Sequence, residues 1–414
     1  MSNNNENKLE PKLRFPEFKN QGGWEAKELN KLGKLVNGLT YSPDDVMEEG
    51  LLVLRSSNIQ NGEIILNDKV YVRPDVKGAN LSEPNDILIC VRNGSKSLIG
   101  KNALIPYGMP LCTHGAFMTV FRSNNPKFVF QLFQTNTYAK KVAGDLGATI
   151  NSINGSNFLK YEFLIPKNHN EQNKIADCLS SLDLVIKAER QKLNTLLSHK
   201  KGILQNVLPQ EGESVPKFRF QEFEKKDDWK ETTLTQVADY ENGKAHENDI
   251  EDSGEYIVVN SKFISTDGEV KKFTNTAFCP TTKGDVLMVL SDIPNGKAIA
   301  KCFFVEEDNR YTVNQRICRI TPRNIDSKIL YYLLNRHPYF LAFDDGVKQT
   351  NLRKEDVLNC PLMIPEDPKE QEKIADTLSS IDELIIAQGQ KLEALQLHKK
   401  GLLQGLFPSI NNVE

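Results

Sequence analysis

The sequence predicts a mixed α/β protein in which two globular domains are joined and spaced by two long helices that form an antiparallel coiled coil. Three observations predict this fold: a helical segment that occurs twice, a heptad pattern in both copies, and a strand-rich stretch of similar length before each copy. The duplication also predicts an approximate twofold relation between the halves. The expected segments are a first domain over 1–168, a first long helix over 169–209, a second domain over 210–368, a second long helix over 369–408 and a tail over 409–414.

The helical repeat is the most informative feature of the chain. Residues 171–209 recur at 370–408 with a constant offset of 199, and 23 of the 39 positions are identical. Core positions advance by alternate steps of four and three residues, an average of 3.5 that is typical of a coiled-coil seam. The seam is apolar except at a few positions, which include Lys200 and Lys399. At about 1.5 Å per residue, each helix is roughly 55 Å long.

Connectivity fixes the direction in which the two helices pair. Pro209 ends the first helix because proline cannot continue it, and the second domain begins by Pro216. That domain then leads into the start of the second helix. Its two ends must therefore lie near the end of one helix and the beginning of the other, which predicts antiparallel helices.

The two domains are themselves related, although more distantly than the helices. Residues 11–18 (PKLRFPEF) match 216–223 (PKFRFQEF) at an offset of 205, and the same offset relates Trp24 to Trp229. Short β-rich runs bounded by Gly, Asn and Asp turns predict a mixed α/β domain with a curved sheet in each half, and one helical segment in each, near 126–143 and 326–341. Because they share one offset beside repeated phenylalanines, the tryptophans are predicted to pack rather than to stack on a ligand.

Composition excludes several classes of protein. No apolar run approaches the roughly 18 residues of a membrane span, and the first residues lack the pattern of a secretory signal. Seven scattered cysteines without a CxxC pair indicate a reduced, cytoplasmic protein rather than a disulfide framework or a zinc site. Residues 1–168 carry 20 basic against 16 acidic side chains, but 210–368 carry 21 against 28. A nucleic-acid surface in the second domain would therefore need strong charge segregation.

The repeated motifs resemble those of the specificity subunit of type I restriction–modification systems. The resemblance covers nearly the whole chain and includes the EQ-x-KIAD-x-LSS helix starts, the HKKG helix ends, the RF-x-EF entry to each half and the Ile-Pro exit before each helix. It implies that each domain is a target-recognition domain for one half of a split double-stranded DNA site. It further implies a chain without catalytic activity that docks two methyltransferase subunits and, in the restriction complex, two translocase–nuclease subunits. S-adenosylmethionine, ATP and magnesium would then bind to those partners rather than to this chain.

Loops that carry Arg, Lys, Asn, Gln, Ser and Thr are the candidate DNA contacts, because these side chains hydrogen-bond base edges and phosphates. The alternative is that the Asn-Gly and Asn-Ser loops are ordinary turns with a solvated surface. The candidates of the first domain are Arg92, Asn93, Ser95, Lys96, Thr113, His114, Asn151, Ser152 and Asn154. The candidates of the second domain are Lys244, His246, Ser291, Asn295, Lys297, Asn314, Gln315, Arg316, Lys348, Gln349 and Asn351.

Two other functions compete with DNA recognition. A two-headed scaffold would use the same helices to hold protein-binding or ligand-binding domains, and an autonomous enzyme would need a catalytic motif. The sequence contains neither the Pro-Pro-aromatic tetrapeptide of amino-methyltransferases nor a glycine-rich nucleotide fingerprint, HExxH or metal-ligand spacing. A non-catalytic subunit that reads a bipartite, asymmetric DNA site is therefore the favoured hypothesis.

Overall fold

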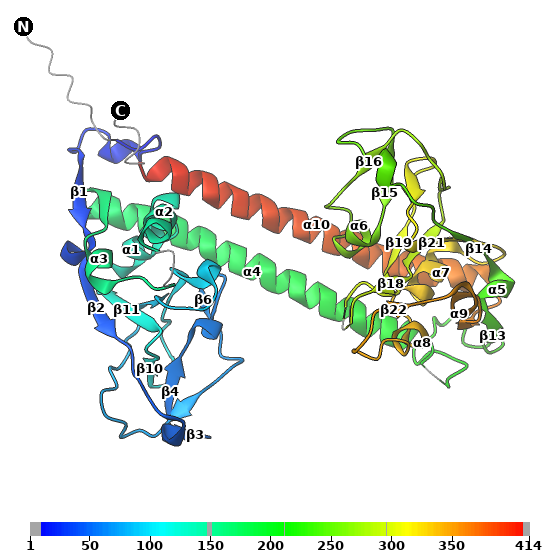
Figure 1. Cartoon of the computed structure of the whole chain (residues 1–414), viewed down its shortest axis with the longest axis horizontal. Coiled ribbons are helices and arrows are strands. Elements are labelled where there is room, and N and C mark those ends of the chain that lie inside the picture. The colour runs from blue at the N-terminus through cyan, green and yellow to red at the C-terminus, as the bar shows by residue number, and fades with distance from the viewer. Residues whose placement is uncertain (1–9, 147–150, 211, 295, 409–414) are drawn as a thin grey trace, which may run out of the picture. The chain divides into compact units, whose positions relative to one another are not determined.

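The computed structural model describes residues 10–146, 151–210, 212–294 and 296–408. Helices and sheets are mixed, as predicted, and two helices of 39 residues dominate the chain, α4 (His169–Val207) and α10 (Pro368–Leu406) (Figure 1). The chain divides into two compact units, Met1–Gln191 with Gln390–Glu414, and Lys192–Gly389. Each long helix therefore contributes one half to each unit. Among the described residues, no helix is both long and apolar enough to span a bilayer.

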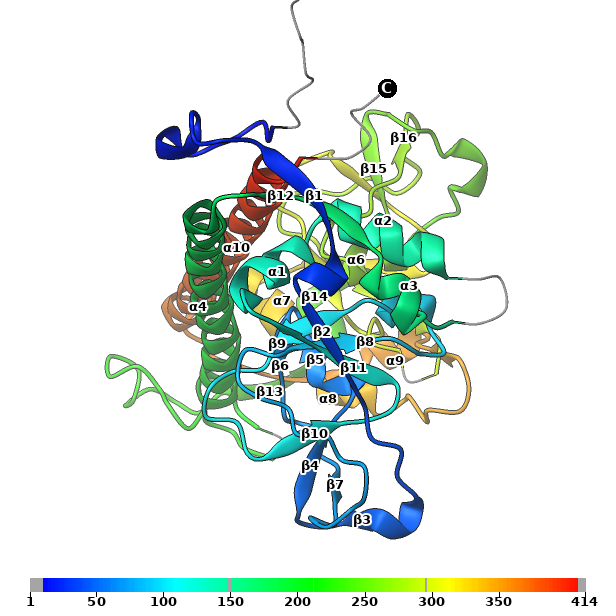
Figure 2. The ribbon, with the colours of Figure 1, turned by 90° about the vertical axis from the view of Figure 1, so that its left-hand side faces the viewer.

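The first unit, which faces the viewer in Figure 2, contains two four-stranded sheets and a two-stranded ladder. The antiparallel sheet has the order β2 (Gly33–Asn37), β11 (Met118–Ser123), β8 (Ile87–Cys90) and β9 (Asn102–Leu104). The mixed sheet has the order β10 (Cys112–His114), β4 (Leu51–Leu54), β7 (Tyr71–Val72) and β3 (Val46–Met47), with β10 and β4 parallel. The ladder pairs β1 (Trp24–Glu28) with β12 (Glu162–Pro166). Two short strands, β5 (Ile59–Gln60) and β6 (Glu63–Ile64), form a separate hairpin.

The second unit repeats the antiparallel sheet and the entry ladder, while its mixed sheet has three strands instead of four. Its antiparallel sheet has the order β14 (Ala238–Asn242), β21 (Ile317–Pro322), β17 (Val286–Val289) and β19 (Cys302–Phe304). Its mixed sheet has the order β16 (Phe273–Thr274), β15 (Tyr256–Val259) and β20 (Tyr311–Val313), with β15 and β20 parallel. Its ladders pair β13 (Lys230–Thr233) with β23 (Pro361–Ile364), and β18 (Ser291–Asp292) with β22 (Thr350–Asn351). The predicted kinship of the two domains is thus visible in their equivalent antiparallel sheets and entry ladders.

Each domain contains more than the one helical segment predicted. The segment at 126–143 is two helices, α1 (Pro126–Leu132) and α2 (Asn136–Asp145), because the Thr135 side chain caps α2 by accepting the Tyr138 N–H. The segment at 326–341 is α7 (Ser327–Leu334) and α8 (Pro338–Leu341), separated at Arg336, whose φ is 61°. Short helices complete the two units: α3 (Gly155–Leu159), α5 (Leu234–Val237), α6 (Ser261–Ser265) and α9 (Lys354–Leu358).

The long helices pair in opposite directions within each unit. In the first unit Lys391 pairs with Glu189 and Lys399 pairs with Asp183, so that residue numbers rise along α10 as they fall along α4. The end of α10 also joins the buried core of the first domain through Leu406. In the second unit the end of α4, at Val207, packs in the core that contains the start of α10. The antiparallel prediction is confirmed within each unit.

The repeated entry motif has a structural role that is the same in both halves. The Arg14 guanidinium donates two hydrogen bonds of 2.8 Å to the Glu171 carboxylate, which is 1% exposed at the start of α4. Arg219 makes the same pair of bonds, at 2.8 and 2.9 Å, to Glu370 in α10. Desolvated, bidentate pairs of this kind fix geometry strongly. The motif therefore attaches the beginning of each domain to a long helix, and the tryptophans that follow are buried as predicted.

Candidate nucleic-acid interface

In the first domain, two of the predicted loops come together where β8 ends. Arg92 forms an antiparallel bridge with Ser152, and the Asn93 N–H donates to the Asn151 carbonyl at 3.4 Å. The Asn151 side chain in turn donates to the Gly94 carbonyl at 3.1 Å. Loops that are separated by almost 60 residues in the sequence therefore present one polar surface.

Phe117 belongs to the same surface, although it was not among the polar residues predicted to contact DNA. Its carbonyl accepts the N–H groups of Val91 and Arg92, at 3.0 and 3.1 Å. The Arg92 guanidinium lies 5.8 Å from the centre of the Phe117 ring, within the range of a cation–π contact. The ring is 57% exposed. We call Arg92, Asn93, Phe117, Asn151 and Ser152 the first loop cluster.

The second domain builds the same backbone arrangement from different side chains. Ser291 pairs with Asn351 between β18 and β22, as Arg92 does with Ser152. The carbonyl of Arg316 accepts the Leu290 N–H at 3.0 Å, as that of Phe117 accepts the N–H of Val91. We call Ser291, Arg316, Gln349 and Asn351 the second loop cluster.

The side chains of the second loop cluster are partly organised by one another. The Gln349 amide donates to the Ser291 hydroxyl at 2.7 Å. The Arg316 guanidinium is exposed and makes no side-chain hydrogen bond or ion pair among the described residues, so its five donors are open to a ligand. Each loop cluster thus contains one exposed arginine. In the first domain it is Arg92, which follows β8, and in the second it is Arg316, which occupies the position equivalent to Phe117.

An open pocket of about 260 Å³ adjoins the second loop cluster. Glu247, Asn260, Ser261, Lys262, Asn314, Gln315 and Arg316 line it. Two of its polar atoms, Asn314 Oδ1 and Ser261 Oγ, are buried without a hydrogen-bond partner in the described structure. The Gln315 amide donates to Glu247 at 2.9 Å. The pocket therefore offers an acceptor and a hydroxyl that a polar ligand or water could satisfy.

The acidic side chain of the second-domain loop is hydrogen-bonded to the backbone of its own loop. Asp292 Oδ2 accepts the N–H groups of Ala298 and Ile299 at 2.6 and 3.1 Å, and Oδ1 accepts the N–H of Ile293 at 2.9 Å. Both carboxylate oxygens of Asp292 are therefore occupied by backbone donors of the loop that follows β18.

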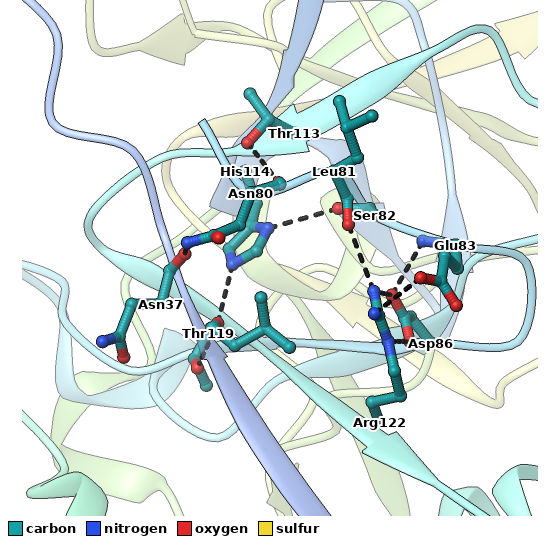
Figure 3. A network of polar contacts seen from close by, with 11 residues as sticks. Asn37, Asn80, Leu81, Ser82, Glu83, Asp86, Thr113, His114, Thr119 and Arg122 are labelled. Atoms are coloured by element: carbon teal, nitrogen blue, oxygen red, sulfur yellow. Dashed lines mark hydrogen bonds and ion pairs between the residues drawn. The ribbon is translucent and has the colours of Figure 1, made fainter. Parts of the chain in front are cut away.

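Thr113 and His114 were predicted to contact DNA, but both are fully buried in β10. His114 Nε2 lies 2.9 Å from the Val36 carbonyl, which can only accept, so this nitrogen carries the proton. Nδ1 then accepts from the Ser82 hydroxyl at 3.2 Å (Figure 3). Burial lowers the pKa of His114 and keeps the ring neutral. Thr113 donates to the Asn80 carbonyl at 2.7 Å, and both residues therefore act structurally.

His246 is the corresponding case in the second domain, with no exposed surface. Its Nδ1 lies 2.6 Å from the Lys244 carbonyl and must donate to it, so Nε2 accepts from the Thr312 hydroxyl at 2.9 Å. The ring ties the backbone at Lys244 to β20. Lys244 itself is exposed and forms a bridge with Asn314 next to the pocket, so it stays a candidate contact.

The remaining predicted residues have mixed environments. Ser95 and Lys96 are exposed beside the first loop cluster, while Asn154 caps α3 by accepting the N–H groups of Ser156 and Asn157. Lys297 and Lys348 are exposed. Asn295 lies outside the described residues. Across the described ranges, no group of three or more His, Cys, Asp or Glu side chains could hold a metal ion.

Comparison with known proteins shows that both halves of the chain match one protein family. A family model described as "Type I restriction modification DNA specificity domain" matches residues 21–198 and 226–397. The type I restriction enzyme StySPI specificity subunit of Salmonella potsdam is 29% identical over 197 residues, which are 45% of this chain and 42% of that protein. The EcoKI specificity subunit of Escherichia coli K12 matches with the same figures. The matched stretch thus spans less than half the length of these relatives.

A solved structure supports the fold over a greater length. The S subunit of a type I restriction–modification system from M. genitalium is similar with a TM-score of 0.64, over 97% of this chain and 100% of that chain. The sequence identity is 17%. At this identity the likeness concerns the fold, and the predicted arrangement of two mixed α/β domains with two long helices is confirmed.

Proposed function

Because the chain belongs to the family of type I restriction–modification DNA specificity proteins, whose domain model matches both of its halves, we propose that it reads a bipartite, asymmetric DNA site. Each domain recognises one half-site, and the base pairs between them are left unread. The chain performs no covalent chemistry itself. It positions methyltransferase subunits on the site and, in a restriction complex, the translocase–nuclease subunits as well.

The observation that carries the proposal is the pair of loop clusters. Two domains whose antiparallel sheets have equivalent strand orders hold the same backbone frame, with bridges at Arg92–Ser152 and Ser291–Asn351. The side chains on that frame nevertheless differ. A common frame with different polar side chains is what two readers of unlike half-sites require, since direct readout depends on the donors and acceptors offered to each base.

The chemistry of each loop cluster suits base edges in the major groove. Arginine pairs in a bidentate manner with guanine, so Arg92 and Arg316 are the candidate guanine readers of the two half-sites. Asparagine and glutamine pair with adenine, a role open to Asn151 and Gln349. The exposed Lys96 would contact phosphate, which adds affinity without sequence preference.

The outer faces of the long helices support the proposed contact with methyltransferase subunits. Exposed aliphatic side chains on the long helices offer apolar surface that a partner subunit would remove from water on binding. Such residues occur on both helices and in both units: Leu184, Val185, Leu197, Leu384, Ile386 and Leu397. S-adenosylmethionine, ATP and magnesium would be bound by the partner subunits, and the complex would act in the cytoplasm.

Selection from a randomised duplex library tests the proposal. The chain, assembled with its methyltransferase partner, is expected to enrich duplexes with two short motifs at a fixed separation. Their affinity should fall steeply with salt, because neutralised phosphates release counterions. Enrichment of no motif by an assembled complex, or binding that salt does not weaken, would instead favour the scaffold function.

A further inference from the structure

One aspartate in each unit uses its two carboxylate oxygens for two different partners. In the first unit, Asp183 of α4 pairs through Oδ1 with the Lys399 ammonium of α10. Its Oδ2 accepts the Gln131 amide of α1 at 2.8 Å. A single side chain therefore links its own helix to the opposing helix and to the domain.

The second unit repeats the arrangement with a different donor. Asp382 of α10 pairs through Oδ1 with the Lys200 ammonium of α4. Its Oδ2 accepts the Tyr332 hydroxyl of α7 at 2.7 Å. The two aspartates, like the two lysines, are related by the repeat offset of 199. Only the residue supplied by the domain has changed.

These contacts explain why lysines occupy seam positions of the heptad pattern. A charged residue in the seam is destabilising unless it has a partner, and the correct register alone supplies one. The numbers of the two paired residues add up to 582 in both units, so both pairs specify the same antiparallel register. A slip of the helices would separate both lysines from their aspartates.

The donors from the domains are held in place by burial. Gln131 is 1% exposed, so its amide is enclosed by the domain and donates to Asp183 from a buried position. Tyr332 is 8% exposed, and the Lys200 ammonium lies 5.5 Å from its ring centre. Burial raises the pKa of Tyr332 and keeps its hydroxyl protonated as a donor.

We propose that Asp183 and Asp382 are positioning residues that tie each recognition domain to the register of the helix pair, so that the complex accepts one spacer length between the half-sites. The inference rests on the proposed function. The buried cores already pack each domain against both long helices, and the shared carboxylate adds a directional contact that joins the helix register to the placement of the domain. A shared carboxylate couples the two.

Tyr332→Phe tests the inference with the smallest change, since it removes the donor to Asp382 and leaves the Lys200–Asp382 pair intact. Tyr331→Phe is the matched control, because the hydroxyl of this neighbouring tyrosine makes no hydrogen bond within the described structure. Each full-length variant is co-expressed with the methyltransferase partner. The complexes then modify a plasmid set in which the two half-sites are separated by every spacer from three base pairs shorter to three longer than the natural one.

Wild type and Tyr331→Phe are expected to modify one spacer length. Tyr332→Phe should modify at least one neighbouring spacer to a tenth or more of the natural level, with both half-sites unchanged. If Tyr332→Phe lowers modification too far to compare spacers, hydrogen exchange of the α7 amides decides. Exchange should be at least threefold faster than in Tyr331→Phe.

The outcomes separate this inference from the proposed function. Wild-type modification of one split site, with Tyr332→Phe equally strict about the spacer, overturns the positioning role and leaves DNA recognition standing. Equal α7 exchange in the two variants overturns it as well. Absence of any split site with wild type removes the proposed function itself.

Discussion

The buried ion pairs at the domain entries predict unequal costs for one substitution made at two equivalent positions. Arg14→Met leaves the Glu171 carboxylate, 1% exposed, without its two strongest hydrogen bonds. Breaking a buried pair by removing one partner costs about 3–5 kcal/mol. Arg219→Met strands Glu370 in the same way, but the Trp229 indole N–H still donates to this carboxylate at 3.2 Å. The equivalent Trp24 N–H has no partner in the described structure.

A hydrogen bond to a charged group is worth about 1.5–3 kcal/mol, so Arg219→Met should cost less than Arg14→Met. Arg219→Met also removes two hydrogen bonds to the carbonyls of Lys226 and Asp227. Arg14→Met removes one such bond, to the carbonyl of Gly22. These carbonyls lie at exposed positions and regain water, so their loss reduces the difference to about 1 kcal/mol.

Hydrogen exchange of the β1 and β13 amides measures the two costs separately in the full chain. Lys230→Met, which removes an exposed pair with Glu366, is the control and should cost under about 1 kcal/mol. The double variant Arg14→Met with Glu171→Leu should recover much of the loss, because no buried charge is then left unpaired. An equal or larger loss for Arg219→Met would refute the reasoning.

Three further predictions follow from the seam, the second loop cluster and the buried histidine. Deleting one heptad from both long helices should shorten the accepted DNA spacer and leave both half-sites unchanged in methylation mapping; altered half-sites would contradict this. Arg316→Ala should relax one position of one half-site by about 1–3 kcal/mol, measured by competition between single-base variants, and equal discrimination would show that Arg316 does not read a base. Burial lowers the pKa of His114, so the unfolded chain binds a proton on this ring more tightly than the folded chain does. The stability due to the neutral ring is therefore present above about pH 6.5 and falls as the pH decreases below that value. His114→Gln should lack that decrease in urea midpoints compared at pH 7.5 and 5.5, and an unchanged decrease would assign it to other groups.

The long helices were predictable because their signal is local and periodic. Both helices begin and end within two residues of the predicted bounds. The reason for Lys200 and Lys399 in the seam was not predictable, since it depends on which aspartate of the other helix lies opposite. The break at Thr135 was also missed, because the hydroxyl that caps α2 lies within a sequence that is otherwise compatible with one helix.

The candidate site was predicted in part. The loop at Arg92 was identified from polar residues after an apolar run and the loop at Asn151 from its Asn and Ser residues, and the Arg92–Ser152 bridge places the two loops together. Thr113, His114 and His246 are also polar residues in predicted loops, but their side chains are buried. A pattern of residue types cannot distinguish a buried polar side chain from an exposed one. Phe117 was missed because an isolated aromatic residue in a sequence is more often part of the core.

Base-resolution methylation mapping tests the central claim most directly. DNA from cells that express the methyltransferase partner with this chain is compared with DNA from cells that lack the chain. The account predicts a split motif with a fixed spacer that is modified only when the chain is present. An assembled complex that modifies no new motif would contradict it.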